Sequence, residues 1–380
     1  MAKTFFQKVQ NSQMVLEKLK NIPDATYIHA GQLTDFISSL FSATGMPVDE
    51  AKLCAEVLVD ADMNGIDTHG VSYNLEHHYL TGLINGYINT TPNVHVTYET
   101  PGTAVVDADK GMGMIASVAA MELAVEKARK TGIASVAVNN SSHYGAAGFY
   151  ARMALEHNMI GFSMSSGGRN VIIPMNGRYP WMGTNPMAFA TPAGDEPPFV
   201  IDMASSTTSY GKVAIARAFG VDIPEGWAQD ADGNAITDIT KFEDSIGQPP
   251  LGVTYDLGAH KGMGIGMMAD VLGAILPGET VSGLLPDKEK GGGRFCHYFQ
   301  ATRIDAFRPA EEFKNDMDVM LRTLREQESA PGLPDIQYPG EPDAAYVTKR
   351  TKEGVPLPRH SIDYFKKMAD TLNVEWTIPG

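Results

Sequence analysis

The sequence predicts an α/β fold in which a mixed central β-sheet is flanked by helical N- and C-terminal parts. Apolar residues recur with helical spacing between residues 31 and 84. The middle of the chain instead carries short apolar, β-branched runs separated by glycine, proline, serine and asparagine, a pattern typical of strands and turns. Helical spacing returns at residues 313–324. Strands between two helical ends favour a layered α/β arrangement.

The first 29 residues form an amphipathic segment that we interpret as an N-terminal extension. A plain N-terminal helix is the simpler interpretation, and cover for a subunit or domain surface is the alternative. Its candidates for burial are Phe5, Phe6, Val9, Val15, Leu16 and Leu19. Helical segments then follow, and residues 65–70 (GIDTHG) separate the second of them from the third. His69 is therefore expected in a loop between helices.

Strands are predicted from residue 94 onward. Alternation at 94–98 and the run 103–107 (TAVVD) predict two of them. The glycines of residues 111–116 (GMGMIA) match the dinucleotide fingerprint and precede a helical run to Lys130. Polar residues separate these glycines from the strand, where the fingerprint needs a tight turn, so we interpret the match as coincidental. Further strands or apolar runs are expected at 133–138, 160–164, 170–174, 187–191, 199–203 and 295–301, and further helices at 263–276 and 361–372.

Composition excludes several classes of partner. A net charge of −15 argues against nucleic acid and anionic membranes, which need a basic field. Hydrophobic residues at 43% and charged residues at 20% are typical of an ordinary soluble globular protein. The two cysteines, Cys54 and Cys296, indicate neither a disulfide framework nor a cysteine metal site. No signal peptide or membrane-spanning run is apparent, so we expect a cytoplasmic protein.

His143 is the first candidate for chemistry. Residues 139–148 (NNSSHYGAAG) join the apolar run 133–138 (IASVAV) to a helical pattern at 146–157. His143 is therefore predicted in a strand-to-helix loop, where ligands commonly bind, and a neutral imidazole exchanges a proton near neutral pH. A capping or turn histidine is the simpler interpretation of a lone histidine.

Further motifs weigh against that simpler interpretation. They are 67–71 (DTHGV), 183–188 (GTNPMA), 200–204 (VIDMA) and 258–264 (GAHKGMG). Together with 141–148 (SSHYGAAG), they resemble the malate/L-lactate dehydrogenase family, which also contains ureidoglycolate and sulfolactate dehydrogenases, diketogulonate reductase and piperideine-2-carboxylate reductase. The resemblance implies a non-Rossmann fold, NAD or NADP as cofactor, and a homodimer. It also implies hydride transfer between the nicotinamide and a 2-hydroxy or 2-oxo acid.

The resemblance implies a division of the chain and of the site. After residues 1–29 we expect a helical substrate and dimer part at 30–110, a nicotinamide-binding mixed-sheet domain at 111–305, and a C-terminal helical part at 306–380. His143 is the first acid/base candidate and His69 the second; Thr68 and Tyr73 are substrate candidates. Cofactor contacts are expected at Thr184, Asn185, Asp202, Met203, Ala204, Lys261, Gly340, Glu341 and Pro342. No metal is expected.

Tyr73 departs from the family pattern, which commonly has an arginine four residues after the first histidine. A phenol donates one hydrogen bond but carries no charge, so a substrate carboxylate must be held elsewhere or is not part of the substrate. Substitutes are sought among His77, His78, Arg169 and Arg178. A cyclic imine carboxylate or keto sugar acid reductase is thus an alternative. A non-catalytic nicotinamide-binding relative is another, although the retained histidines, Asp202 and Lys261 disfavour it.

Overall fold

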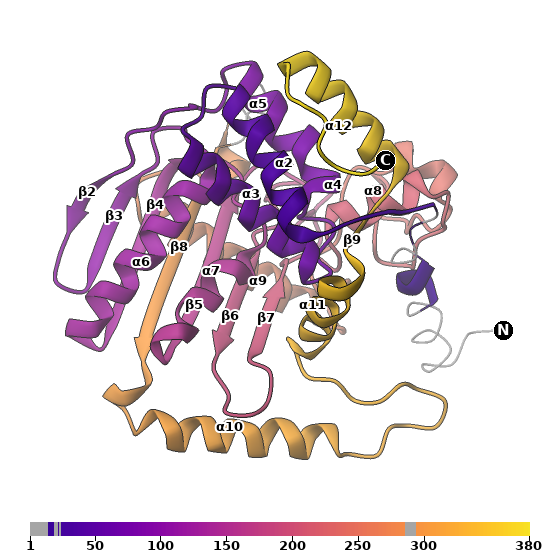
Figure 1. Ribbon diagram of the computed structural model, residues 1–380. Helices are drawn as coiled ribbons and strands as arrows, with labels where there is room; N and C mark the ends of the chain where they lie inside the picture. Colours follow the sequence, from indigo (N-terminus) through magenta and orange to yellow (C-terminus); the bar gives the residue numbers. More distant parts are fainter. Residues whose placement is uncertain (1–13, 19–21, 23, 286–293) are drawn as a thin grey trace.

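A seven-stranded mixed β-sheet forms the centre of the protein (Figure 1). The computed structural model describes residues 14–18, 22, 24–285 and 294–380. In spatial order the strands are β2 (His95–Glu99), β3 (Thr103–Asp107), β4 (Ile133–Ser141), β8 (Phe295–Arg303), β5 (Met159–Gly167), β6 (Met187–Thr191) and β7 (Phe199–Met203). Within this sheet β3 and β4 pair in parallel, and the other neighbours pair antiparallel. The predicted mixed central sheet is confirmed.

The pairing directions bring several chain segments to one edge of the sheet. Because β8 is antiparallel to both β4 and β5, and β6 is antiparallel to both β5 and β7, the strands β3, β4, β5 and β7 all run the same way. Their carboxyl ends therefore lie at a common edge, together with the first residues of β6 and β8. We call it the carboxyl edge. Ligands of open α/β sheets commonly bind at such an edge.

Helices cover both faces of the sheet (Figure 1). Helices α6 (Gly113–Thr131) and α7 (Ala147–Met153) pack on one face, and α2 (Ala30–Ala43) and α3 (Val48–Met63) form a layer outside them. The other face is covered by α9 (Ala259–Ala269), which continues into a π-helical turn (Asp270–Ile275). One large apolar core joins α2, α3, α6 and α7 to the sheet.

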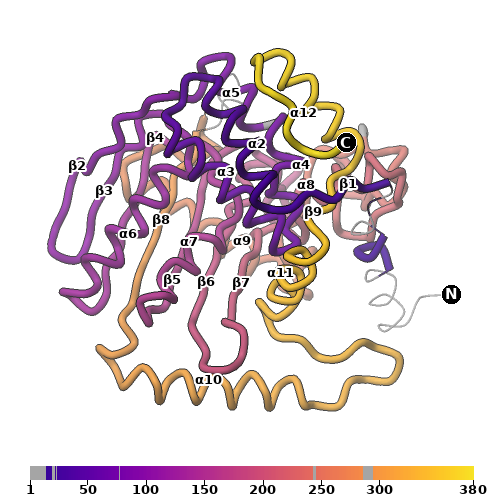
Figure 2. Tube along the Cα trace, in the orientation of Figure 1, coloured from indigo at the N-terminus to yellow at the C-terminus, as the bar shows by residue number. Residues whose placement is uncertain are grey.

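The chain also contains further helical elements. They are α4 (Val71–Asn74), a π-helical turn (Leu75–Leu80), α5 (Thr81–Ile84), α8 (Tyr210–Ala218), α10 (Ala310–Arg325), α11 (Glu341–Glu353) and α12 (Arg359–Leu372). A second sheet pairs β1 (Thr26–Ile28) with β9 (Val355–Leu357), so the start of the described chain lies beside its C-terminal part (Figure 2). No helix of the described residues is long and apolar enough to cross a membrane.

Most predicted elements are present, with three differences. Residues 170–174 form no strand: Ile172 makes isolated bridges to Met182 and Gln248, and Pro174 has no N–H to extend a ladder. Helix α11 was not predicted because its polar sequence carries little apolar periodicity, although Pro342 in its first turn suits a helix start. Strands β1 and β9 have three residues each, too few for a pattern.

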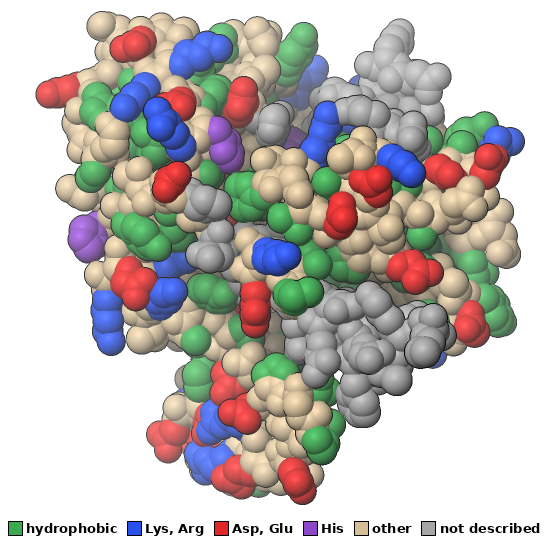
Figure 3. All heavy atoms as spheres, turned by 90° about the vertical axis from the view of Figure 1, so that its right-hand side faces the viewer, with side chains coloured by type: hydrophobic (Ala, Val, Ile, Leu, Met, Phe, Trp, Pro, Cys, Tyr) green, Lys and Arg blue, Asp and Glu red, His purple; other side chains and the backbone are tan. Residues whose placement is uncertain are grey.

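The N-terminal extension is described only in part. Val15 and Leu16 pack against a small apolar cluster that includes Val213 and Ala216 of α8. Phe5, Phe6, Val9 and Leu19 lie outside the described residues. On the face shown in Figure 3, acidic and basic side chains are interspersed rather than segregated.

Candidate active site

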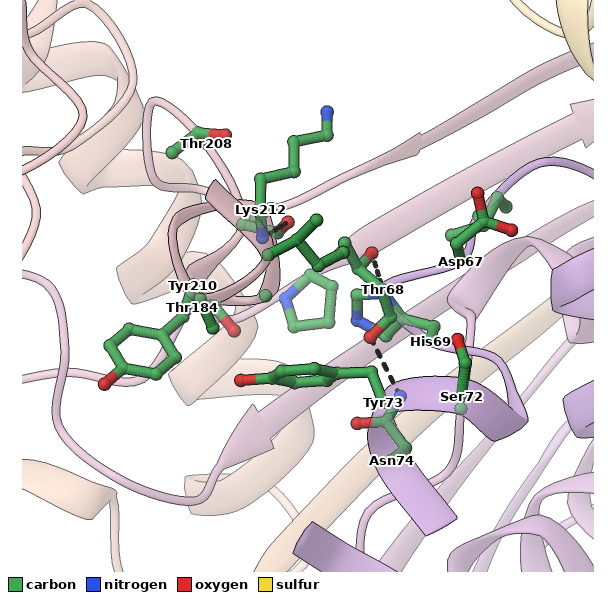
Figure 4. Close-up of a pocket in the computed structure, with 18 of the residues that line it drawn as sticks. Asp67, Thr68, His69, Ser72, Tyr73, Asn74, Thr184, Thr208, Tyr210 and Lys212 are labelled. Carbon is green, nitrogen blue, oxygen red and sulfur yellow. Dashed lines mark hydrogen bonds between the residues drawn. The ribbon is translucent and has the colours of Figure 1, made fainter. Parts of the chain in front are cut away.

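A cavity of about 1200 Å³ lies at the carboxyl edge, walled by segments far apart in the sequence. The α3–α4 loop, the β4–α7 loop, the segment after β5, the end of β7 and the start of α8 all contribute. Figure 4 shows residues of the α3–α4 loop and of the start of α8. Among the predicted site residues, its walls include Thr68, His69, Tyr73, His143, Thr184, Asp202, Met203, Ala204 and Pro342. The structure therefore brings both candidate histidines into one cavity.

His143 is held by the start of α6. It lies two residues beyond β4, and the Gly113 backbone N–H at the start of α6 donates to the Ser142 hydroxyl at 2.9 Å. A Cβ at Gly113 would lie 2.1 Å from the Ser142 carbonyl oxygen and 2.8 Å from that of His143. Only a glycine at position 113 lets α6 pack this closely against the loop that carries His143. This packing accounts for Gly113 in residues 111–116 without a dinucleotide fingerprint.

Tyr79 fixes the orientation of the His143 ring. Its hydroxyl lies 2.5 Å from Nδ1 of His143, and the Gly145 backbone N–H donates to the same nitrogen at 3.3 Å. Since both contacts use Nδ1, the other ring nitrogen, Nε2, is left for a ligand. A phenolic hydroxyl either donates or accepts, so Tyr79 supports the ring in both of its protonation states.

A π-helical turn brings two consecutive side chains to His143. The His78 ring stacks on it with centroids 4.7 Å apart and an interplanar angle of 9°, while Tyr79 makes the hydrogen bond. Widened turns of this kind are frequent at functional sites. The His69 ring lies 5.8 Å from the His143 ring on centroids, so three imidazoles gather in the cavity.

The surroundings keep His143 and His69 uncharged at neutral pH. Burial, followed by the neighbouring His78, His69 and His297, holds the pKa of His143 well below its usual range. Burial, followed by His78 and Lys212, lowers the pKa of His69 to about 4. A neutral imidazole can accept a proton from a hydroxyl group, and its conjugate acid is a correspondingly strong proton donor.

A buried charged network holds the loop that carries His69. Arg350 of α11 is 5% exposed and makes a two-pronged ion pair with Asp67, with Nη1–Oδ1 at 2.5 Å and Nη2–Oδ2 at 3.2 Å. It also donates to the Asp62 carbonyl oxygen. The Asp62 carboxylate accepts from the Val71 backbone N–H at 2.9 Å. The loop is therefore tied to α3 and to α11 on either side of His69.

One hydroxyl group within this loop contacts His69. The Thr68 hydroxyl lies 2.9 Å from Nδ1 of His69, and the Asn74 side chain donates to the Thr68 carbonyl oxygen at 2.9 Å. Figure 4 shows the Tyr73 side chain extending from α4 into the cavity toward Tyr210 and Thr184. Burial, and to a lesser degree Tyr210, raises the pKa of Tyr73 to about 12, so its phenol stays protonated and can donate.

Asp202 supplies a buried carboxyl group at the end of β7. Its Oδ2 accepts from the Gly148 backbone N–H at 2.7 Å, and a Cβ at Gly148 would lie 2.9 Å from that oxygen. Burial raises the pKa of Asp202 to about 6, while the Gly148 N–H and Arg152 act in the opposite direction. Arg152 in turn pairs with Asp60 of α3. Asp202 therefore connects the cavity wall to α7.

Four predicted cofactor residues do not line this cavity. Asn185 donates to the Gly266 carbonyl oxygen at 2.9 Å and to Asp270 at 2.8 Å, which fixes the strand start beneath Thr184. Gly340 has a φ of 99° at the start of α11, and Glu341 pairs with Arg325 at 3.1 Å. Lys261 is exposed in the first turn of α9. Their cofactor contacts stay predictions. Within the described part of the chain, no cluster of three histidine, cysteine or acidic side chains could hold a metal ion.

The sequence profile of the malate/L-lactate dehydrogenase family matches residues 28–366. The chain belongs to the malate/L-lactate dehydrogenase family. A similar curated relative is malate dehydrogenase from Pyrococcus horikoshii, 37% identical over 359 residues, which are 94% of this chain and 99% of the relative. L-sulfolactate dehydrogenase from Methanocaldococcus jannaschii is 33% identical, over 87% of this chain and 92% of its own.

Solved structures agree with this membership of the malate/L-lactate dehydrogenase family. Malate dehydrogenase from Entamoeba histolytica matches with a TM-score of 0.89 at 27% identity, over 93% of this chain and 99% of its own. The Pyrococcus horikoshii structure matches with a TM-score of 0.85 at 33% identity, over 93% and 98% of the two chains. The predicted family fold and enzyme class are confirmed: the chain is a nicotinamide-dependent oxidoreductase that acts on the CH–OH group of hydroxy acids.

Several residues of this family member's cavity were not predicted from the sequence as site residues. Tyr79 falls in the apolar stripe of a helical pattern, which predicts a core residue, and it is indeed fully buried. Tyr210, Lys212 and Phe295 also line the cavity. The signal that could have found Lys212 is its place in the first turn of a helix that follows a serine- and threonine-rich segment, a common surrounding for anions.

Proposed function

We propose that this enzyme interconverts a small 2-oxo acid and its 2-hydroxy acid, with malate or lactate as the hydroxy acid, and that His143 handles the proton. The observation that carries the proposal is the His143 ring at the carboxyl edge, with Nδ1 held by Tyr79 and with His69 in the same cavity. The names of the curated relatives, malate dehydrogenase and L-sulfolactate dehydrogenase, support this substrate class.

The cavity fits a nicotinamide dinucleotide together with a small acid. Its volume of about 1200 Å³ exceeds the roughly 300–1,000 Å³ typical of a pocket for one ligand. We propose that Thr184, Asp202, Met203, Ala204 and Pro342 hold the cofactor, because these predicted residues line the cavity. When bound, the cofactor supplies or accepts the hydride. NAD is proposed, since a relative from Escherichia coli is named ureidoglycolate dehydrogenase (NAD(+)).

The protein groups divide the remaining work. In the oxidation direction, His143 acts in the tautomer that carries its proton on Nδ1. This Nδ1–H donates to the Tyr79 oxygen, the contact from the Gly145 N–H is given up, and Nε2 accepts the proton of the substrate hydroxyl. In the reduction direction, protonated His143 returns that proton to the substrate oxygen. His69, whose Nδ1 contacts the Thr68 hydroxyl, presents its other nitrogen for a second hydrogen bond to the substrate. The Tyr73 hydroxyl donates to a polar end of the substrate.

The lowered pKa of His143 predicts opposite pH dependences in the two directions. Oxidation needs the neutral ring, so its single-turnover rate should stay flat from about pH 8 down to 6.5 and fall only below the ordinary histidine value of 6.5. Reduction needs the protonated ring. Over the same interval the protonated fraction, and with it the reduction rate, should rise about tenfold for each unit by which the pH falls. Stopped-flow rates of nicotinamide oxidation and reduction check this. A reduction rate that does not change between these pH values would exclude His143 as the donor.

A substrate panel tests the proposed function. The absorbance of reduced nicotinamide is followed with NADH or NADPH and with oxaloacetate, pyruvate, keto sugar acids and cyclic imine carboxylates, alongside a titration of cofactor binding. The imines are included because Tyr73 stands where the family commonly has an arginine, and a related structure is a piperideine-2-carboxylate reductase from Pseudomonas syringae with a TM-score of 0.78 at 25% identity. Oxidation of NADH with a 2-oxo acid supports the proposal. Cofactor binding without turnover on any compound would favour the non-catalytic relative.

A cytoplasmic homodimer is also proposed. The α9 helix and the π-helical turn after it expose an apolar stripe made of Met267, Met268, Val271, Ile275 and Leu276. Contiguous apolar surface of this kind commonly marks a protein interface. Both cysteines are free, in keeping with a reducing compartment. Sedimentation equilibrium measures the oligomeric state.

A further inference from the structure

Three cationic side chains line the cavity, and they differ in their surroundings. They are Arg169, Lys212 and Arg217. The Arg217 guanidinium lies over the Phe242 ring, 5.4 Å from its centroid, at the last turn of α8. Lys212 lies in the first turn of α8 and is close enough to His69 to lower its pKa. Arg169 makes no hydrogen bond or ion pair with another described residue.

The register of the sheet places Arg169 near His143. Phe295 at the start of β8 pairs with Ser141 at the end of β4 on one side and with Gly167 at the end of β5 on the other. His143 lies two residues beyond Ser141, and Arg169 lies two residues beyond Gly167. Both therefore leave the same edge of the sheet from strands that flank β8. Two strand spacings separate these strands, about 10 Å, which a small acid and a long arginine side chain can bridge.

Side-chain contacts connect the two segments through Phe295. The His143 and Phe295 rings meet edge to face with centroids 5.4 Å apart. On the other side, a Cβ at Gly168 would lie 2.5 Å from Cζ of the same ring, so the backbone before Arg169 packs directly on it. Gly168 has a φ of 73°, which turns the chain sharply after β5. Phe295 thus forms an apolar wall with His143 on one side and the Arg169 segment on the other.

The structure also eliminates another candidate from the sequence. Arg178 donates to the Ala231 carbonyl oxygen at 3.0 Å and pairs with Asp232 at 3.3 Å, and it is not among the residues that line the cavity. His78 lines the cavity, but its ring is stacked on His143. The His77 side chain lies outside the described residues. Among the described residues that line the cavity, Arg169 therefore offers the guanidinium on the Phe295 side of His143. A planar guanidinium binds a carboxylate through two parallel hydrogen bonds, which an ammonium group does not.

We propose that Arg169 binds the carboxylate of the 2-oxo acid substrate. It takes over the role of the arginine that the family commonly has at the position of Tyr73. The inference rests on the proposed function and deepens it. It assigns the substrate's C1 carboxylate to the Phe295 side of the cavity, the carbonyl oxygen to His143, and any polar group beyond the reacting carbon to the Tyr73 and Tyr210 side. The substrate class is a short 2-oxo acid with a free carboxylate.

Arg169→Met tests the assignment with a 2-oxo acid and the amide of the same acid. The wild-type enzyme should prefer the acid, and in Arg169→Met kcat/KM for the acid should fall about 100-fold while that for the amide changes less than about threefold. Cofactor affinity, measured by fluorescence titration, should stay within about twofold. Arg178→Met is the matched control, since this arginine lies in the same connection between strands and outside the cavity wall. It should leave both kcat/KM values unchanged.

Relocating the charge gives a second readout. In the Arg169→Met background, Tyr73→Arg should recover at least about tenfold of kcat/KM for the acid, because it returns a guanidinium to the cavity. A wild-type enzyme without activity on any 2-oxo acid would refute the proposed function. An active wild-type enzyme whose preference for the acid survives Arg169→Met would refute the role of Arg169 alone. Loss of that preference in Lys212→Met, with Arg169→Met unchanged, would assign the carboxylate to Lys212 and overturn the inference.

Discussion

Replacing His143 by alanine should lower kcat about 10³-fold while leaving nicotinamide binding nearly intact. The His143 ring accepts the transferred proton in the oxidation direction and donates it in the reduction direction. General acid/base catalysis by a positioned side chain raises a reaction rate about 10²–10⁴-fold. The cavity volume and the proposed cofactor residues at the end of β7 do not depend on the imidazole. Single-turnover rates and a fluorescence titration of NADH binding measure the two effects separately. Turnover at the wild-type rate would remove His143 from the mechanism.

Two further variants distinguish His143 from its neighbours. Tyr79→Phe removes the hydroxyl that holds Nδ1, so kcat should fall roughly tenfold with little change in KM, as expected for loss of one orienting hydrogen bond. Tyr144→Phe is the matched control: it is equally buried and adjacent to His143 in the chain, but its hydroxyl contacts Ser163 at 3.3 Å. If His69→Ala reduces kcat more than His143→Ala does, the acid/base role belongs to His69.

Replacing Arg350 by methionine should cost about 3–5 kcal/mol of unfolding free energy. The substitution leaves the Asp67 carboxylate without its cation and the Asp62 carbonyl oxygen without its donor, and breaking a buried ion pair from one side is costly. Urea titration followed by circular dichroism measures the change. Arg350→Met protein that remains folded should also lose activity, because the same network positions the loop of His69.

Lys349→Met is the matched control for Arg350. Lys349 is the preceding residue of α11, its side chain is 61% exposed, and its ion pair with Glu353 has a separation of 3.8 Å, so the substitution should change stability by less than about 0.5 kcal/mol. Adding Asp67→Asn to Arg350→Met should recover part of the loss, since it removes one unpaired charge. A loss below about 1 kcal/mol in Arg350→Met would contradict the buried network.

The sequence predicted those parts of the site that are local in the chain. A short apolar run followed by turn residues and a helical pattern gave the position of His143, because strand, loop and helix there are consecutive. The same reasoning placed His69 between helices. That both rings share a cavity could not follow from spacing, since it depends on how α3 and α4 pack against the end of β4.

The roles of residues whose partners lie far away in the chain could not be predicted from the sequence. Tyr79 occupies an apolar position of a helical pattern, which is typical of a core residue. In the structure it lies in a π-helical turn, and its hydroxyl contacts His143. Arg350 lies in a polar helix that gave no apolar pattern, and its partner Asp67 is 283 residues away. Two neighbouring residues of one predicted cofactor motif also have different surroundings. Thr184 lines the cavity, whereas the Asn185 side chain is buried and donates to Asp270.

The ion pair between Arg350 and Asp67 also has a consequence for how the enzyme is made. The two residues are 283 positions apart, so at about 5–20 residues per second a ribosome needs roughly 15–60 s after Asp67 to deliver the arginine. During that time the growing chain carries the Asp67 carboxylate without its cation. We therefore expect the loop of His69 to reach its final shape only when synthesis is almost complete, and a chain that stops before α11 to carry both histidines without activity.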